Sequence, residues 1–212
     1  MTALFIGIFA GLLSFFLIDK TILLVRQCLL DSNFAAGLRA VTGIIMAQLL
    51  WALVAAAAIG TARYEVVAGD HINSIHGLDT TFVMLGALIL GFAAYRLLQR
   101  PLPTLSENET VTPGQELTSL LRIALTTPIR ILIYLALFSI LGIHFVAERI
   151  ANLVFIVLGT GFGAFVSWSM FCSIIDKHKE KITLKQIARF SRWGAGSILL
   201  LVVFGLVFLA VF

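Results

Sequence analysis

Residues 13–25 read LSFFLIDKTILLV, so Asp19 and Lys20 stand side by side inside an apolar run. Ionised groups are costly in hydrocarbon, and those found inside membrane spans usually mark a functional site. Of the 212 residues, 60% are hydrophobic and only 12% are charged, whereas a soluble domain carries roughly 25% charged residues. The composition predicts an all-α integral membrane protein. It leaves no room for a soluble catalytic domain, so we expect neither an enzyme nor a cofactor.

The apolar segments predict six membrane spans, since a spanning helix needs about 20 mostly apolar residues. We expect these spans at 3–25, 38–60, 80–98, 118–142, 149–175 and 191–212. The stretch at 99–117, which contains Pro, Gly and acidic residues, is the expected cytoplasmic linker between two groups of three helices in one transmembrane domain. The first apolar segment lacks a basic region before it, so we expect a retained helix rather than a signal peptide.

The basic residues predict the orientation, because short cytoplasmic loops are enriched in Lys and Arg. Eleven of them flank the first, third and fifth loops: Arg26, Arg39, Arg96, Arg100, Arg122, Lys177, Lys179, Lys181, Lys185, Arg189 and Arg192. The second and fourth loops hold two, Arg63 and Arg149. We therefore expect a multi-pass membrane protein with the first, third and fifth loops in the cytoplasm and both termini outside. Three spans per half then give two inverted three-helix halves, as in inverted-repeat transporters.

Asp19, Lys20 and Arg130 are the charged residues that lie well inside the predicted spans. Counted from Arg26 and Arg122, Asp19 and Arg130 lie about 10 Å and about 12 Å in from the cytoplasmic interface. They would therefore sit at nearly the same level on the first and fourth spans. Lys20 has a stem long enough to carry its ammonium towards the headgroups. The pair is either a structural ion pair between two helices or part of a substrate passage.

The fourth span reads LRIALTTPIRILIYL around Arg130. Thr127, Arg130 and Tyr134 have i, i+3, i+7 spacing and would share one helical face. Pro128 removes a helical hydrogen bond and disfavours helix at the residue before it. A broken helix beside a polar stripe is typical of transporter substrate sites. It is equally typical of a structural kink whose freed carbonyl groups bond to threonine hydroxyls.

Small residues at four-residue spacing predict close helix contacts. They are Gly159, Gly163 and Ser167 in the fifth span and Gly43 and Ala47 in the second. Gln48 is a candidate for an interhelical hydrogen bond or for the passage. We expect the basic stretch KHKEKITLKQIARFSRW, residues 177–193, to lie on the anionic inner leaflet before the sixth span.

No metal site and no nucleic-acid partner are expected. The outer segment GDHINSIHGLD holds His71 and His76, but their spacing and the lack of nearby cysteines make a metal site a poor interpretation. Cys28 and Cys172 are interpreted as small buried residues. The expected partners are the lipid bilayer and a small-molecule substrate, and the chain is compatible with a homodimer.

Four segments resemble the lysine exporter (LysE/RhtB) translocator superfamily, whose members are small six-helix bacterial exporters of amino acids and related solutes. They are GLRAVTGIIMAQ from Gly37, LGALILGFAAYRLLQR, LLRIALTTPIRILIYLALFSILG, and the basic stretch before GAGSILLLVVFGLVFL. The resemblance covers almost the whole chain and implies the six-helix fold. It also implies the bacterial cytoplasmic (inner) membrane as the location and export as the function.

The chain departs from this family at its most diagnostic motif. The Pro-Gly-Pro of the first helix should fall at Ile18, Asp19 and Lys20, where neither proline nor glycine occurs, so this helix need not break. The family's Asn-Pro corresponds to Thr127-Pro128, and an Asp common in the fifth helix is replaced near Phe165.

The sequence thus predicts a secondary transporter that exports a small amino-acid-like or other charged or zwitterionic metabolite. The alternative is a membrane subunit or scaffold that does not transport. Divalent-metal export is disfavoured because hard cations need several oxygen ligands, and the predicted spans offer one well-buried carboxylate, Asp19.

A first test follows from Asp19, whose protonation inside the membrane would couple export to the proton gradient. Asp19→Asn should abolish proton-driven flux in proteoliposomes while the purified protein stays folded. Lys20→Gln, the neighbouring control, should change flux little. Unchanged proton coupling in Asp19→Asn would rule out this role for the carboxylate.

Overall fold

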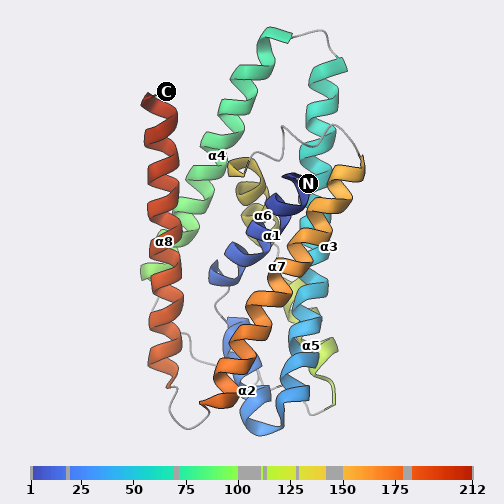
Figure 1. Cartoon of the computed structure of the whole chain (residues 1–212), viewed down its shortest axis with the longest axis vertical. Helices are drawn as coiled ribbons and strands as arrows, with labels where there is room; N and C mark the ends of the chain where they lie inside the picture. Colours follow the sequence, from blue (N-terminus) through green and yellow to red (C-terminus); the bar gives the residue numbers. More distant parts are fainter. Residues whose placement is uncertain are drawn as a thin grey trace.

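The computed structural model describes residues 2–17, 20–68, 72–99, 111, 114–127, 129–141, 150–178 and 183–211, and these contain helices and no β-strand. The helices are α1 (Thr2–Ser14), α2 (Lys20–Asp31), α3 (Phe34–Ala68), α4 (Ile72–Gln99), α5 (Glu116–Leu125), α6 (Ile129–Ile140), α7 (Ile150–Lys177) and α8 (Leu184–Val211). A short 3-10 helix, η1 (Phe15–Leu17), follows α1. Figure 1 shows that they form one elongated bundle, with the ends of α4, α7 and α8 reaching different heights.

Two described helices, α3 and α7, are long and apolar enough to cross a membrane, over Phe34–Thr61 and Ala151–Lys177. A third span results if α5 and α6, whose axes are bent by 72°, are counted together. The described part of the chain is therefore an all-helical protein with two or three candidate membrane spans. Large hydrophobic side chains on its outer surface, such as Phe162 and Leu200, are more than half exposed, as expected for lipid-facing groups.

Helical structure continues past several of the predicted span ends. The outer loop expected at 61–79 is mostly helical, since α3 continues to Ala68 and α4 begins at Ile72. The basic segment expected on the membrane surface is also joined to its span, because α8 runs unbroken from Leu184. It contains no proline, and Gly194 and Gly196 are accommodated within the helix. The linker at 99–117 falls largely outside the described residues.

The tightest helix contact joins α1 to α7. A Cβ added to Gly7 would lie 2.1 Å from the Ile156 carbonyl oxygen, and one added to Gly11 would lie 2.2 Å from that of Thr160. From the other side, a Cβ added to Gly159 would lie 2.4 Å from an α1 backbone oxygen, and one added to Gly163 would lie 2.2 Å from another. The two helices therefore touch backbone to backbone, and the small-residue face expected in the fifth span meets α1 through both glycines. Ser167 donates to Gly163 O within its own helix.

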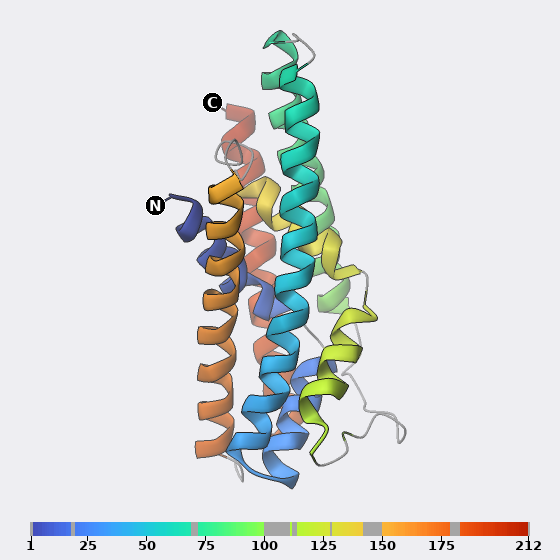
Figure 2. The ribbon, with the colours of Figure 1, turned by 90° about the vertical axis from the view of Figure 1, so that its right-hand side faces the viewer.

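A second close contact joins α3 to α5. A Cβ on Gly43 would lie 2.3 Å from Leu117 O and 3.0 Å from Leu121 N. Ala47, one turn further along α3, is fully buried. The small residues of the second span therefore let α5 approach α3 closely. In Figure 2 the two helices run side by side.

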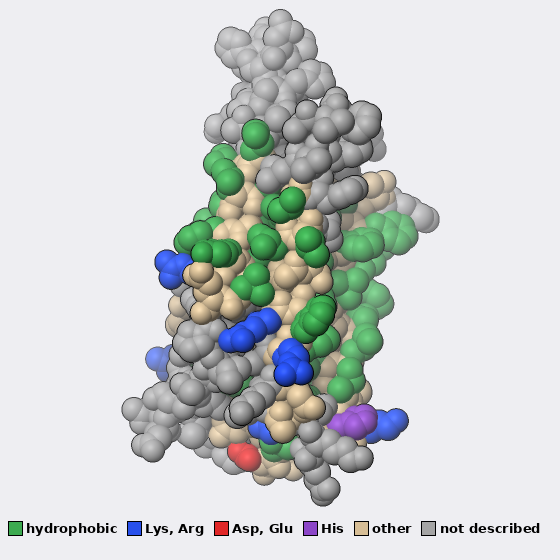
Figure 3. All heavy atoms as spheres, turned by 90° about the vertical axis from the view of Figure 1, so that its left-hand side faces the viewer, with side chains coloured by type: hydrophobic (Ala, Val, Ile, Leu, Met, Phe, Trp, Pro, Cys, Tyr) green, Lys and Arg blue, Asp and Glu red, His purple; other side chains and the backbone are tan. Residues whose placement is uncertain are grey.

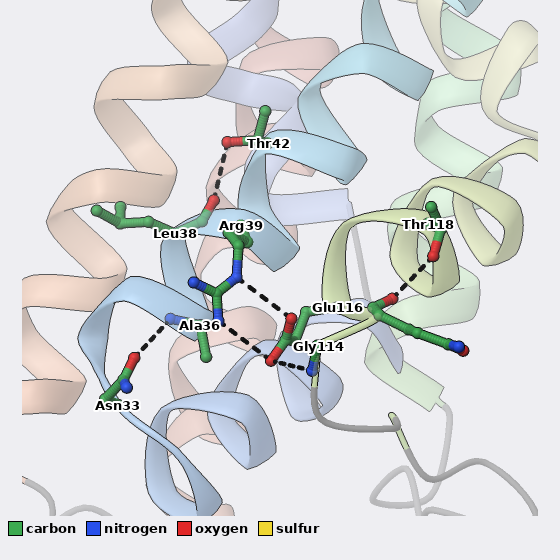
Figure 4. Close-up of polar contacts among 9 residues, drawn as sticks. Asn33, Ala36, Leu38, Arg39, Thr42, Gly114, Glu116 and Thr118 are labelled. Carbon is green, nitrogen blue, oxygen red and sulfur yellow. Dashed lines mark hydrogen bonds and ion pairs between the residues drawn. The ribbon is translucent and has the colours of Figure 1, made fainter.

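An ion pair closes this second contact at its end (Figure 4). Arg39 Nε lies 3.3 Å from Glu116 Oε2, and the Gly114 backbone N–H donates to Glu116 Oε1. Glu116 is the first residue of α5 and is 3% exposed. It is therefore a buried structural partner of Arg39, which the sequence did not indicate.

The buried side chains form two apolar clusters, one above the other. The upper cluster includes Ala10, Ala52, Tyr134 and Ile156. The lower cluster, nearer the junction of α2 and α3, includes Phe15, Ile44, Leu120 and Ala164. In Figure 3 the Lys and Arg side chains of the visible face lie in its lower half, so the lower cluster is next to the basic end of the molecule.

Replacing a glycine of the α1–α7 contact tests its closeness. Gly11→Ala places a methyl group against α7 backbone and should lower the unfolding free energy by roughly 1–3 kcal/mol. Gly196→Ala is the matched control, because nothing lies within 4 Å of the added Cβ. It should be neutral or stabilising by up to about 1 kcal/mol. Thermal unfolding in detergent compares the two, and equal melting temperatures would contradict the close contact.

Candidate functional site

The first predicted span is not one helix. The α-helical structure ends at Ser14, a 3-10 turn covers Phe15–Leu17, and α2 begins at Lys20. The expectation that this span need not break was therefore wrong. Two local features favour the interruption. The Ser14 hydroxyl donates to Gly11 O within the last turn of α1, and Asp, present at position 19, is a favoured residue directly before a helix.

The fourth predicted span is interrupted as Pro128 suggested, with α5 ending at Leu125 and α6 beginning at Ile129. Pro128 itself lies outside the described residues. Thr127 belongs to the interruption and not to the helical face of Arg130 and Tyr134, so the predicted three-residue stripe is wrong at its first member. The stripe on α6 consists of Arg130 and Tyr134, one turn apart and both buried.

The freed carbonyl groups at this interruption are bonded to the protein. The Thr126 and Thr127 hydroxyls both donate to Ile123 O at 3.0 Å. The Trp51 indole N–H donates to Ala124 O at 3.3 Å. Because these oxygens already accept hydrogen bonds, ligand recognition at this level depends on side chains rather than on the α5 carbonyl groups.

Arg130 forms a contact between the helices that follow the two interruptions, α2 and α6. Its side chain is 8% exposed, and its Nη2 donates a long hydrogen bond of 3.5 Å to the Thr21 hydroxyl, which is itself 3% exposed. Thr21 is the second residue of α2 and Arg130 the second of α6. The start of each half-helix therefore faces the other, and a guanidinium occupies the junction.

Tyr134 extends this junction by one turn of α6. It is 2% exposed and packs on Phe138, with ring centroids 5.8 Å apart. Its hydroxyl lies near Ser14 but outside the geometry of a good hydrogen bond. The two ends of the first interruption thus meet the same face of α6, with Ser14 beside Tyr134 and Thr21 beside Arg130.

These residues belong to a wider set of buried polar side chains between the two apolar clusters, here called the polar layer. It consists of Ser14, Thr21, Gln48, Arg130 and Thr160. On α3 and on α7, the polar residue lies between one residue of the upper cluster and one residue of the lower cluster. Gln48 stands between Ile44 and Ala52 on α3, and Thr160 between Ile156 and Ala164 on α7.

Gln48 differs from the other members in its hydrogen bonding. The Thr160 hydroxyl donates to Ile156 O, whereas the Gln48 side-chain oxygen, in a residue 1% exposed, meets no partner among the described residues. The interhelical bond expected for Gln48 is therefore not seen there. A buried amide that lacks a partner is costly, so Gln48 is the second candidate, after Arg130, for contact with a ligand.

Three predicted site residues are not described in their side chains. Asp19 and Pro128 lie outside the described residues, and only the backbone of Lys20 is described. The predicted approach of Asp19 to Arg130 stays a prediction. Thr21, two residues after Asp19, does lie against Arg130, as the depth argument requires of this part of the chain.

The sequence analysis missed Ser14, Thr21 and Thr160. A hydroxyl group in an apolar helix can bond to the carbonyl four residues earlier, so isolated Ser and Thr residues give little signal in a hydropathy pattern. A usable signal was the position of Ser14 and Thr21 on either side of the charged pair.

Comparison with known proteins adds no relative to this geometry. No protein-family model, no curated protein and no solved structure matches the chain.

The indole bond at the interruption provides a test of how the α5 carbonyls are satisfied. Trp51→Phe removes the donor to Ala124 O and should cost roughly 1–3 kcal/mol of unfolding free energy. Trp193→Phe is the control, because Trp193 is 74% exposed, and it should change stability by less than about 0.5 kcal/mol. Chemical or thermal unfolding in detergent measures both, and an unaffected Trp51→Phe would show that this bond does not stabilise the interruption.

Proposed function

We propose that the chain is a secondary transporter of six spans, in two inverted halves, that exports a small charged or zwitterionic metabolite. The observation that carries the proposal is the meeting of two helix interruptions at one buried guanidinium. Interrupted helices at corresponding positions of two repeats are the best sequence-level indication of a transporter binding site. Here they occur in the first and fourth predicted spans, which are equivalent positions of the two halves.

The helix contacts support the inverted repeat. If spans one, two and three correspond to four, five and six, then the α1–α7 contact corresponds to the contact of α5 with α3. Both are close contacts mediated by glycine, and they are the two most extensive in the bundle. The remaining long-helix contacts, α3 with α7 and α4 with α8, each join a span to its own counterpart.

The distribution of charge supports the orientation. Arg26, Arg39, Lys177 and Arg189 flank the α2–α3 and α7–α8 junctions, which lie together at the lower end in Figure 1. Both marked ends of the chain lie in the upper half. By the positive-inside rule the lower end is cytoplasmic, and both termini are outside.

Arg130 suits an anionic group of the metabolite. A guanidinium presents a fork of donors that matches a carboxylate in two-point geometry. Its low exposure between apolar clusters strengthens such a bond. Asp19, two residues before Thr21, would supply the site for an ammonium group and the proton that couples transport.

The family resemblance points the same way. The 3-10 turn η1 ends at Leu17, directly before positions 18–20, where the lysine exporter superfamily has Pro-Gly-Pro. We propose that this chain is a divergent member in which a 3-10 turn and the charged pair replace that motif. The conserved element would then be the broken helix rather than its proline and glycine residues.

One observation favours the second candidate, a membrane subunit or scaffold without transport. The carbonyl groups at the α5–α6 interruption bond to Thr126, Thr127 and Trp51, as expected for a purely structural kink. In that case Arg130 would hold α2 against α6 and would bind no ligand.

Efflux separates the two candidates. Proteoliposomes loaded with the twenty amino acids should release at least one of them faster than protein-free liposomes, as measured by mass spectrometry of the external medium. Arg130→Gln should reduce that release at least tenfold. Arg130→Lys keeps the charge but not the fork and should give an intermediate rate.

Arg122→Gln is the matched control, since it removes an exposed guanidinium from α5 and should leave efflux unchanged. If no amino acid leaves faster than from empty liposomes while the protein is folded, export of amino acids is rejected. Equal losses in Arg122→Gln and Arg130→Gln would remove Arg130 from the site.

A further inference from the structure

Five aromatic rings gather directly below Ser14, on the side of the basic end. Phe15 is their hub. Its ring centroid lies 5.1 Å from that of Trp168, 5.6 Å from Phe16, 5.7 Å from Phe171 and 6.5 Å from Phe190. Phe15 is 5% exposed and Trp168 is fully buried. We call these five residues the aromatic cluster.

The aromatic cluster separates Ser14 from the basic end. Ser14, immediately before Phe15, belongs to the polar layer, whereas Phe15 belongs to the lower apolar cluster. Trp168 and Phe171 come from α7, two and three turns beyond Thr160, and Phe190 comes from the basic part of α8. A solute entering from the basic end would have to pass this level to reach Ser14, the member of the polar layer on the α1 side of η1.

The parts of the cluster differ in how firmly they are held. Trp168, Phe171 and Phe190 project from α7 and α8, which are helices of 28 residues each. Phe15 and Phe16 project from η1, a three-residue 3-10 turn between α1 and α2. A 3-10 stretch in the middle of a helical segment often marks a hinge. The movable members are therefore Phe15 and Phe16.

The α8 surface has a shaped seat for one of them. A Cβ added to Gly194 would lie 2.1 Å from Phe16 Cδ1, so the Phe16 ring occupies the space that a side chain at 194 would fill. Phe16 also packs on Phe190 at 5.8 Å. The seat holds η1 against α8 through aromatic contacts alone, which can be broken and remade without leaving a charge unpaired.

We propose that Phe15 and Phe16 on η1 form an aromatic gate that is closed in this structure and that opens Ser14, the part of the polar layer on the α1 side of η1, towards the basic, cytoplasmic end when η1 leaves its seat on α7 and α8. The inference rests on the proposed transport function, because it assigns a side of entry to the same site. It is tested without any transported substrate.

The test reports access to Ser14. Ser14→Cys is introduced into a background in which Cys28→Ala and Cys172→Ala remove both native thiols. Methanethiosulfonate ethylsulfonate, a membrane-impermeant anionic thiol reagent, is applied to inside-out and to right-side-out vesicles. The closed gate should give slow labelling in both. Adding Phe15→Ala should raise the labelling rate at least tenfold in inside-out vesicles and less than twofold in right-side-out vesicles.

Phe9→Ala is the matched control, because it makes the same change on α1 at a ring that is 56% exposed. It should leave labelling at the parent rate. If Phe15→Ala also labels at the parent rate, or if its rate rises equally in both vesicle types, the gate is rejected. Should Phe15→Ala fail to purify as a monodisperse protein, Phe190→Ala, which removes the α8 side of the cluster, is judged by the same criteria.

The result also separates this inference from the proposed function. Sided labelling without efflux of any amino acid supports the gate and rejects amino-acid export. Efflux that depends on Arg130, with unsided labelling, supports export and rejects the gate.

Discussion

A charge buried inside this bundle has to be compensated by protein atoms, and Arg130, whose side chain is 8% exposed, places this constraint on the helices around it. A buried guanidinium must be compensated by neighbouring oxygen atoms, since desolvation alone would cost several kcal/mol. The Thr21 hydroxyl is one such atom, and it is available because α2 starts anew at the level where α6 starts. The break between α1 and α2 therefore has a physical counterpart in the charge on α6.

The layered interior follows from the same constraint. Polar side chains gathered at one level disturb apolar contacts least if the remaining residues form separate clusters above and below them. The helices that carry this layer are held by contacts between glycine residues and backbone, where dispersion forces are strong and no polar group is required. Such contacts join α1 to α7 and α5 to α3.

The sequence predicted the helical class, the approximate positions of the long helices, the break near Pro128 and the close-contact role of the glycines. Each of these has a strong local cause: apolar length, a missing amide hydrogen or a missing Cβ. It did not predict the interruption after Ser14, which lacks proline and glycine and depends on contacts with α6, α7 and α8. It placed Thr127 on the wrong element because helical periodicity was continued through the break. The Arg39–Glu116 pair joins residues 77 positions apart, and pairing at that distance requires the three-dimensional arrangement.

The length of α3 has its own consequence. Its 35 residues correspond to about 52 Å of helix, whereas the hydrocarbon layer is about 30 Å thick. Even at a tilt of about 40°, the upper end of the observed range, the helix would extend over about 40 Å along the membrane normal. About 10 Å of the helix must then lie outside the hydrocarbon layer, at the level of the lipid headgroups. As a membrane span, α3 would therefore place the residues at its ends among the headgroups as well as in hydrocarbon.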